Sequence, residues 1–309
     1  MPHPAPPTSP LETLAGWLRD ADRILIGAGA GLTAAAGIDY TDTEAFARVF
    51  PAFAARGLRA QYQMIGLPMA PELLWGYWAV HVDYVRYDPR PNPLYQQLRE
   101  LVGERDHFVW TSNVDGLFTR NGFAADRVYT PQGDYALYQC TGPCTRQVWD
   151  FTPVMERLLA SVDPDTGAVT DPAAIPHCPR CGADVFLNVR LDASFIDDHF
   201  SPTGERLVSW LKDTPDPNLV VLDIGTGWNT PVVVRKPMEN IAMAFPASRL
   251  ARINRDHAQV PERLGDRAVS LSDNADTVIR RLAPPGTSGT ATHAPSGRQA
   301  TNRRRSSAR

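Results

Sequence analysis

Five short apolar runs, separated by segments with helical patterns, are the feature that most constrains the fold of this chain. Each run is almost continuously apolar and ends in a small or polar residue, which is typical of buried parallel strands. The runs lie at residues 23–27, 107–111, 219–224, 249–253 and 267–271. We therefore expect an α/β protein with a Rossmann-like, doubly wound parallel sheet that binds its ligand at the carboxyl ends of the strands.

Two stretches interrupt this alternation and predict a second, smaller domain. Residues from about 43 to 102 carry aromatic side chains at helical spacing, among them Phe46, Phe50 and Phe53, and predict a helical insertion. Residues from about 134 to 192 hold all four cysteines and predict a zinc-binding insertion. Both insertions are expected to emerge beside the strand ends, so that the smaller domain lies over the larger one.

The ends of the chain have a different composition from its body. Residues 284–309 include five arginines but no large apolar residue, so ordering them would cost more entropy than burial returns. Residues 1–10 contain five prolines and no apolar run. We expect one folded body over residues 11–283, between a disordered N-terminus of residues 1–10 and a disordered basic tail of residues 284–309.

The overall charge and hydropathy exclude several classes of protein. The 31 basic residues against 34 acidic ones give a net charge of −3, so no nucleic-acid partner is expected. No segment approaches the roughly 18 consecutive apolar residues that a membrane span needs, and the N-terminus lacks the pattern of a signal peptide. These features predict a cytoplasmic protein without a membrane partner.

The cysteines form two closely spaced pairs, Cys140 with Cys144 and Cys178 with Cys181. Two such pairs supply four thiolates, which complete a tetrahedral zinc site and leave no position for a reacting water. The spacing therefore predicts a structural Zn²⁺. Unligated redox cysteines are the alternative.

A glycine-rich turn follows the first apolar run, with Gly27, Gly29 and Gly31 at alternate positions. Glycines allow the backbone to approach a pyrophosphate closely, and a helix start directs N–H groups at phosphates. A tight strand-to-helix turn is the alternative. The third glycine comes one position too early for the dinucleotide pattern of dehydrogenases, and no second strand ending in an acid follows about twenty residues on, which disfavours that class.

Several motifs in chain order resemble the sirtuin family of NAD-consuming enzymes. The family's G-A-G-x-S-x-x-S-G-I-P-D-F-R is matched over residues 29–38, with Asp39 and Tyr40 taking the places of its Asp and Phe, although the proline and arginine are missing. T-Q-N-I-D-x-L-H appears at residues 111–118 and V-x-E-L-H-G-S at residues 128–134. The G-T-S phosphate turn and the I-N-x-E ribose motif correspond to residues 225–227 and 253–256.

This resemblance implies a set of NAD-binding and catalytic residues. Asn113, Asp115 and Gln132 take the catalytic positions, with Asp115 holding the nicotinamide carboxamide and Asn113 orienting the ribose or an attacking group. An Asx-type turn at the strand end is the alternative for the first two. The implied NAD-binding residues are Gly29, Ala30, Gly31, Thr33, Gly37, Asp39, Tyr40, Ser112, Asn113, Asp115, Gln132, Gly225, Thr226, Gly227, Asn254 and Asp256.

Gln132 stands where sirtuins carry their catalytic histidine. Deacylation needs a base near neutral pH, and a glutamine amide cannot accept that proton. Transfer of ADP-ribose to an external acceptor depends less on a base at this position. Asp134 is a candidate base for that acceptor, with a turn-capping carboxylate as the alternative. Arg190 and Asp192 are expected either to place charges where acyl-lysine usually lies or to form a salt-bridged strand edge.

The motifs are most similar to those of the macrodomain-linked, class M sirtuins, which are protein ADP-ribosyltransferases. By resemblance, the partners are a lipoylated carrier similar to the glycine-cleavage H protein, as substrate, and a macrodomain hydrolase, with a role in the response to oxidative stress. Two other functions stay open. One is an NAD-dependent deacylase in which another group replaces the histidine, and the other is a catalytically weak module that senses NAD or ADP-ribose.

Overall fold

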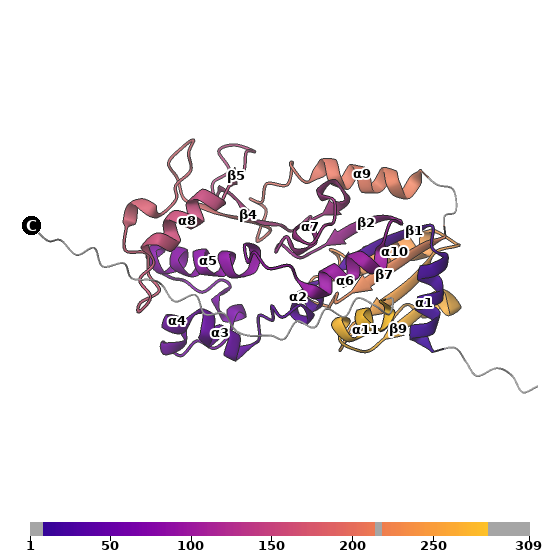
Figure 1. Cartoon of the computed structure of the whole chain (residues 1–309). Helices are drawn as coiled ribbons and strands as arrows, with labels where there is room; N and C mark the ends of the chain where they lie inside the picture. The colour runs from indigo at the N-terminus through magenta and orange to yellow at the C-terminus, as the bar shows by residue number, and fades with distance from the viewer. Residues whose placement is uncertain (1–8, 214–217, 284–309) are drawn as a thin grey trace, which may run out of the picture.

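The computed structural model describes residues 9–213 and 218–283 (Figure 1). Most of the two segments expected to be disordered, residues 1–8 and 284–309, lies outside the described residues. The described structure begins at Ser9, two residues before the expected domain boundary at residue 11. Helix α1 (Pro10–Asp20) begins at Pro10 because Ser9 caps it: its hydroxyl accepts from the Glu12 N–H, and the Glu12 carboxylate accepts from the Ser9 N–H.

The larger domain is built on a six-stranded parallel sheet in the order β3-β2-β1-β7-β8-β9. The five predicted strands are confirmed within one residue, and each is stabilised by the burial of its apolar run. They are β1 (Arg23–Ala28), β2 (Asp106–Thr111), β7 (Leu219–Ile224), β8 (Arg249–Ile253) and β9 (Ala268–Leu271). The edge strand β3 (Val128–Tyr129) was not predicted, since two residues are too few to produce an apolar run.

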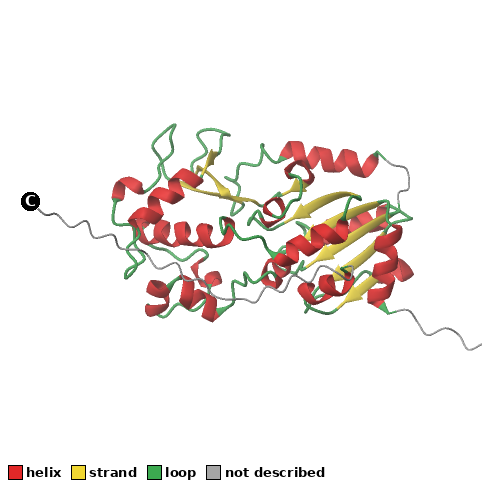
Figure 2. Ribbon diagram, viewed as in Figure 1, coloured by secondary structure: helices red, strands yellow, loops and turns green. Residues whose placement is uncertain are grey.

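Helices cover both faces of this sheet, as the doubly wound prediction requires (Figure 2). One face packs against α1, α6 (Pro93–Val102) and α11 (Ala275–Leu282). The other face packs against α9 (Ser201–Lys212) and α10 (Arg235–Ala244). The remaining short elements of this domain are α2 (Ala30–Ala35), α7 (Leu117–Arg120), η2 (Ala125–Arg127) and η4 (Glu262–Arg267).

The smaller domain joins the two predicted insertions around one shared core. Its helices are α3 (Thr43–Val49), α4 (Pro51–Ala55), η1 (Gln61–Met64), α5 (Pro71–Arg86), α8 (Thr152–Ser161) and η3 (Pro172–Ala174). A three-stranded antiparallel sheet in the order β5-β4-β6 completes it, from β4 (Gly133–Cys140), β5 (Trp149–Asp150) and β6 (Val185–Val189). Aromatic side chains from α3 to α5 pack against α8 and β4 in that core.

The expected helical insertion, residues 43–102, extends one helix too far. Tyr95 and Leu98 of α6 are fully buried against the large sheet, so the insertion ends with α5. An amphipathic pattern shows which face of α6 is buried but not which domain buries it. No helix within the described residues is long and apolar enough to cross a membrane.

Candidate active site

The predicted cofactor residues other than Gln132 follow the carboxyl ends of four adjacent strands, β1, β2, β7 and β8, and therefore gather at one edge of the sheet (Figure 1). The glycine turn after β1 lies directly against the Gly225 turn after β7. The Gly31 N–H donates to the Gly225 carbonyl over 3.0 Å, and the Gly29 N–H donates to the Ile224 carbonyl over 3.0 Å. Glycine is required at both Gly31 and Gly225, because a Cβ at Gly31 would lie 2.7 Å from the Gly225 Cα.

Asp115 is held deep in this site by two hydrogen bonds. The Thr33 hydroxyl donates to its Oδ2 over 2.7 Å and the Leu117 N–H donates to its Oδ1 over 2.9 Å. Only 4% of Asp115 is exposed. Burial raises the pKa of Asp115, and these two hydrogen bonds partly oppose the rise. The Thr33 contact joins α2 to the loop after β2, so two of the segments that carry predicted site residues meet here.

Asn113 lies beside it, with 9% of its surface exposed. Its side-chain amide donates to the Gly29 carbonyl over 3.1 Å, while its backbone N–H donates to the Thr111 hydroxyl over 3.0 Å. The neighbouring Ser112 N–H donates to the Ala28 carbonyl over 3.1 Å. These hydrogen bonds fix the loop after β2 to the glycine turn. Asp115 also makes the Asx-type bond that was the alternative prediction, so the same residue forms that local turn and lies in the site.

The phosphate turn and the ribose loop are bonded to each other. The Asn254 side chain donates to the Thr226 carbonyl over 2.8 Å and accepts from the Asp256 and His257 N–H groups at 3.0 and 2.9 Å. The Thr226 hydroxyl donates to Asp223 over 2.6 Å. Asn254 therefore orders the two loops, while Asp256 is exposed and paired with Arg255. Gly227 follows Thr226 at the surface end of the turn.

A buried cluster of four charged side chains supports these loops and was missed by the sequence analysis. Its members are Asp223, Arg235, Glu239 and Arg252, each at most 5% exposed. Arg252 pairs with Asp223 and Glu239 at 2.8 and 3.0 Å, and Arg235 donates to the Thr226 and His257 carbonyls at 3.1 and 2.8 Å. The sequence does contain a signal for this cluster, because a charged residue stands inside each of two apolar runs, at Asp223 and Arg252, and a buried charge needs a partner.

Tyr40 reaches into the smaller domain. Its hydroxyl lies 3.2 Å from the His81 Nε2 and 3.4 Å from the Tyr135 hydroxyl. Burial lowers the pKa of His81 to about 3, so its imidazole is neutral. Asp39 turns the preceding segment by accepting from the Thr41 N–H over 2.8 Å. The turn at Gly37, with φ of 90°, separates these two residues from Ala30 and the other residues of α2.

Gln132 lies in the loop between β3 and β4, partly buried. Its carbonyl accepts from the Arg190 N–H over 2.9 Å. Asp134 forms a two-armed ion pair with Arg86 of α5, at 2.9 and 3.3 Å, and also accepts from the Ala136 N–H over 2.7 Å. Asp134 therefore has the turn-capping role given as the alternative, and its carboxylate is occupied by Arg86, which the sequence analysis missed.

Arg190 and Asp192 hold a loop together and do not pair with each other. The Arg190 guanidinium pairs with Asp197 at 2.8 Å, donates to the Pro131 carbonyl over 3.2 Å and lies 4.4 Å above the Phe195 ring. Asp192 accepts from the Ser194 N–H over 2.7 Å, and its hydrogen bonds with Ser194 lower its pKa. Of the two arrangements expected from the sequence, Arg190 therefore has the salt-bridged strand edge.

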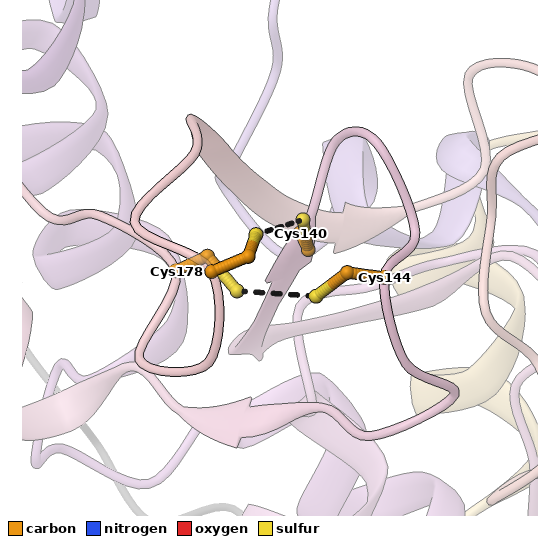
Figure 3. A group of neighbouring side chains, drawn as sticks. Cys140, Cys144 and Cys178 are labelled. Atoms are coloured by element: carbon orange, nitrogen blue, oxygen red, sulfur yellow. Dashed lines mark hydrogen bonds between the residues drawn. The ribbon is translucent and has the colours of Figure 1, made fainter.

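The four cysteines converge at the end of the smaller sheet (Figure 3). Their sulfur atoms all lie within 4.8 Å of one another, with Cys140 to Cys181 at 3.8 Å and Cys144 to Cys178 at 3.6 Å. Tetrahedral ligands at 2.3 Å from Zn²⁺ are separated by about 3.8 Å, so the donor set fits this metal. Burial opposes ionisation of Cys178, but the Cys181 and Arg180 N–H groups outweigh it and lower its pKa to about 6.

We expect Cys178→Ser to destabilise the fold without selectively removing activity, because the site has four protein ligands and no open position. The protein purified without chelator should contain about one equivalent of zinc, and the variant should lose about 3 kcal/mol or more of unfolding free energy. Metal analysis and thermal unfolding measure both. Arg180→Ala, a change in the same turn, is the matched control. Less than about half an equivalent of zinc in the unaltered protein contradicts the prediction.

Three curated proteins show how this chain is related to known ones. It is 33% identical over 287 residues to a probable bifunctional ADP-ribose hydrolase/ADP-ribosyltransferase of Fusarium oxysporum, covering 90% of this chain and 48% of that protein. The chain therefore spans about half the length of that relative. It is 25% identical to a protein ADP-ribosyltransferase of Staphylococcus aureus, covering 88% and 86%. An NAD-dependent protein deacylase 2 of Pseudomonas aeruginosa is 30% identical over 135 residues, covering 43% and 52%.

Solved structures show the same fold. A mutant Sir2 homologue in complex with ADP-ribose superposes with a TM-score of 0.56 at 19% identity, covering 88% of this chain and 96% of that one. A Sir2 homologue in complex with NAD gives a TM-score of 0.55 at 18% identity, covering 88% and 93%. No family model matches the chain. Because the solved structures are only 18–19% identical to this chain, they establish its fold alone. The relation in sequence rests on the curated proteins.

Proposed function

We propose that this chain, which has the fold of solved Sir2 homologues and is related in sequence to curated protein ADP-ribosyltransferases, is an NAD-dependent protein mono-ADP-ribosyltransferase. NAD is the co-substrate, nicotinamide is released, and ADP-ribose passes to a protein acceptor. The observation that carries the proposal is the convergence of Asn113, Asp115 and the Gly225 turn on the glycine turn, with a glutamine at position 132.

The described side chains support cleavage of the bond between nicotinamide and ribose. We assign to Asp115 the task of holding the nicotinamide carboxamide, because it is buried at the centre of the site and is bonded to Thr33. Asn113 is assigned to the ribose, and the bonded loops of Thr226 and Asn254 to the phosphates and the adenosine. As nicotinamide leaves, positive charge develops on the ribose, and a preorganised polar site lowers the barrier without a covalent protein nucleophile.

Gln132 favours transfer over deacylation. Its amide can donate to and accept from ribose hydroxyls, but it cannot take up a proton as a base does. A deacylase in which another group acts as that base is the second candidate, favoured by the partial match to the Pseudomonas aeruginosa deacylase. That match covers less than half of this chain, whereas the two ADP-ribosyltransferase relatives match it along most of its length.

For the acceptor we propose a lipoylated carrier protein similar to the glycine-cleavage H protein, in agreement with the resemblance to class M sirtuins. The name of the Fusarium oxysporum relative combines an ADP-ribose hydrolase with an ADP-ribosyltransferase, which supports a functional partnership with a hydrolase that removes the modification. A role in oxidative stress is a prediction of the same resemblance, and a cytoplasmic location stays a prediction from the hydropathy pattern of the sequence.

The function is tested by incubating the protein with labelled NAD and the lipoylated carrier, followed by intact-mass measurement. One ADP-ribosyl group should be added to the carrier as one equivalent of nicotinamide is released. The unlipoylated carrier is the matched control for the role of the lipoyl group. Release of the acyl group from acylated peptides, with no mass gained by any protein, contradicts the transferase assignment.

We expect Gln132→Ala to lower the rate of ADP-ribosyl transfer by the equivalent of about 1–4 kcal/mol of transition-state stabilisation, because it removes hydrogen bonds to the ribose. Gln132→His restores a titratable group, yet it should not create an efficient deacetylase, because Arg190 still closes the edge beside it. Transfer and acyl-peptide hydrolysis are measured side by side with one stock of NAD. Efficient deacylation by the histidine variant alone shows that the Arg190 loop does not exclude acyl-lysine.

A further inference from the structure

ADP-ribosyl transfer to a neutral acceptor releases a proton, and neither Asp134, the candidate base, nor the other side chains considered so far is suited to take it. Gln132 cannot accept a proton, and the Asp134 carboxylate is already engaged by two Arg86 nitrogens and the Ala136 N–H. His81 is also unsuitable. Its two ring nitrogens contact Tyr40 and Tyr77, and it is only 1% exposed. The site therefore needs another base.

His199 is a titratable side chain that the assigned residues leave without a role. It lies in the segment between β6 and α9, packed on the Phe200 ring with 3.9 Å between ring centroids. Both of its ring nitrogens are shielded from solvent, and neither has a hydrogen-bond partner within the described residues. Two buried polar atoms without partners cost folding free energy, which a ligand bonded to them would recover.

A series of contacts places the His199 segment beside Gln132. The backbone N–H of Arg190 donates to the Gln132 carbonyl, its guanidinium donates to the Pro131 carbonyl, and the same guanidinium pairs with Asp197, two residues before His199. On the other side, α9 packs against β3, the strand that leads to Gln132. Figure 1 shows the segment running from the smaller sheet to the start of α9, between the two domains.

The charges around His199 keep it able to accept a proton. Burial lowers its pKa, and the carboxylates of Asp198, Asp134 and Asp197 oppose this effect. Each of those carboxylates is itself paired with an arginine. Asp197 and Asp198 both pair with Arg146, and Asp197 pairs with Arg190 as well. Asp134 pairs with Arg86. The net result is a pKa below the ordinary histidine value of about 6.5, so the imidazole is neutral near pH 7.

We propose that His199 is the catalytic base that deprotonates the acceptor during ADP-ribosyl transfer, an inference that rests on the proposed function. The acceptor oxygen or nitrogen forms a bond with C1′ of the ribose while the bond from C1′ to nicotinamide breaks. The bonding electrons leave with nicotinamide, which becomes neutral. The acceptor proton passes to a His199 ring nitrogen and then to solvent. The base thus comes from the segment after β6 rather than from position 132.

The test compares nucleophiles that must lose a proton with nucleophiles that have none to lose. Methanol represents the first kind, and azide and labelled nicotinamide represent the second. In His199→Gln, transfer to methanol should fall about 100-fold or more, while transfer to azide and nicotinamide exchange stay within about threefold of the unaltered protein. Transfer to methanol by the unaltered protein should decline as the pH falls through the lowered pKa of His199, and the variant should lack this decline.

His107→Gln is the matched control, because His107 is partly buried, packs on Phe123 and lies at the opposite end of β2 from Asn113. Its rates with all three nucleophiles should not change. Thermal unfolding confirms that each variant is folded, and His199→Ala with added imidazole gives a second measurement, in which transfer to methanol should recover at least tenfold.

The outcomes separate the two proposals. Absence of both nicotinamide exchange and ADP-ribosylation of the carrier in the unaltered protein overturns the proposed function itself. If exchange is present, the role of His199 is overturned by equal loss with all three nucleophiles, by methanol transfer in His199→Gln at the unaltered rate, or by an unaltered protein that transfers nothing to methanol. Failure of imidazole to rescue a folded His199→Ala variant also overturns it.

Discussion

Gly225→Ala is expected to abolish NAD binding and to destabilise the protein by about 3 kcal/mol or more. Gly225 has a φ of 69°, in the left-handed region, and an added Cβ would lie 2.2 Å from the Leu32 nitrogen and 2.5 Å from the Gly31 carbonyl carbon. Both neighbours are backbone atoms of the glycine turn, which cannot move aside as a flexible side chain does. The substitution therefore forces the two phosphate-binding turns apart.

Gly227→Ala is the matched control for the effect on stability alone, because Gly227 itself belongs to the turn assigned to the NAD phosphates. It lies two residues along the same turn, it has no left-handed φ, and an added Cβ meets no atom within 4 Å. Titration calorimetry with NAD and thermal unfolding measure the two effects. We expect Gly227→Ala to differ by about 0.5 kcal/mol or less in unfolding free energy. Unchanged NAD affinity in Gly225→Ala contradicts the contact between the two turns as the basis of the binding site.

Asn113→Ala is expected to lower NAD consumption and ADP-ribosyl transfer about 100-fold or more while the protein remains folded. The side chain is fixed by its bond to the Gly29 carbonyl and is assigned to the ribose, so its loss removes positioning at the reacting carbon. The stability cost is limited to one internal hydrogen bond, about 1 kcal/mol. Labelled nicotinamide release and thermal unfolding give the two quantities separately.

The control for this variant is Asn274→Ala, which removes the cap of α11. The Asn274 side chain accepts from the Asp276 N–H over 2.9 Å, and its loss should cost about 1 kcal/mol, similar to the cost at Asn113. Activity should be unaffected, because Asn274 has no part in the assigned site. A fall in nicotinamide release of the same size in both variants shows that instability, rather than positioning, explains the effect at Asn113.

The sequence alone was sufficient to predict the five long strands, the smaller domain and the four-cysteine site. Each of these depends on a local pattern: a short apolar run that ends in small or polar residues favours a buried parallel strand, and two cysteine pairs at short spacing bring thiolates together within a turn. The positions of Asn113 and Asp115 were predictable for the same reason, since both directly follow a buried parallel strand, whose carboxyl end lies at the binding edge.

The tertiary structure alone decided which partners polar side chains have far along the chain. Arg86 pairs with Asp134 across 48 positions in the chain, and Arg252 meets Asp223 across 29. The tertiary structure also decided which domain buries the apolar face of α6, because that face would fit either one. It likewise placed His199 near charged residues from separate elements. Ion pairs and unpartnered ring nitrogens are set by distances between segments that packing brings together, and no local pattern of residues encodes those distances.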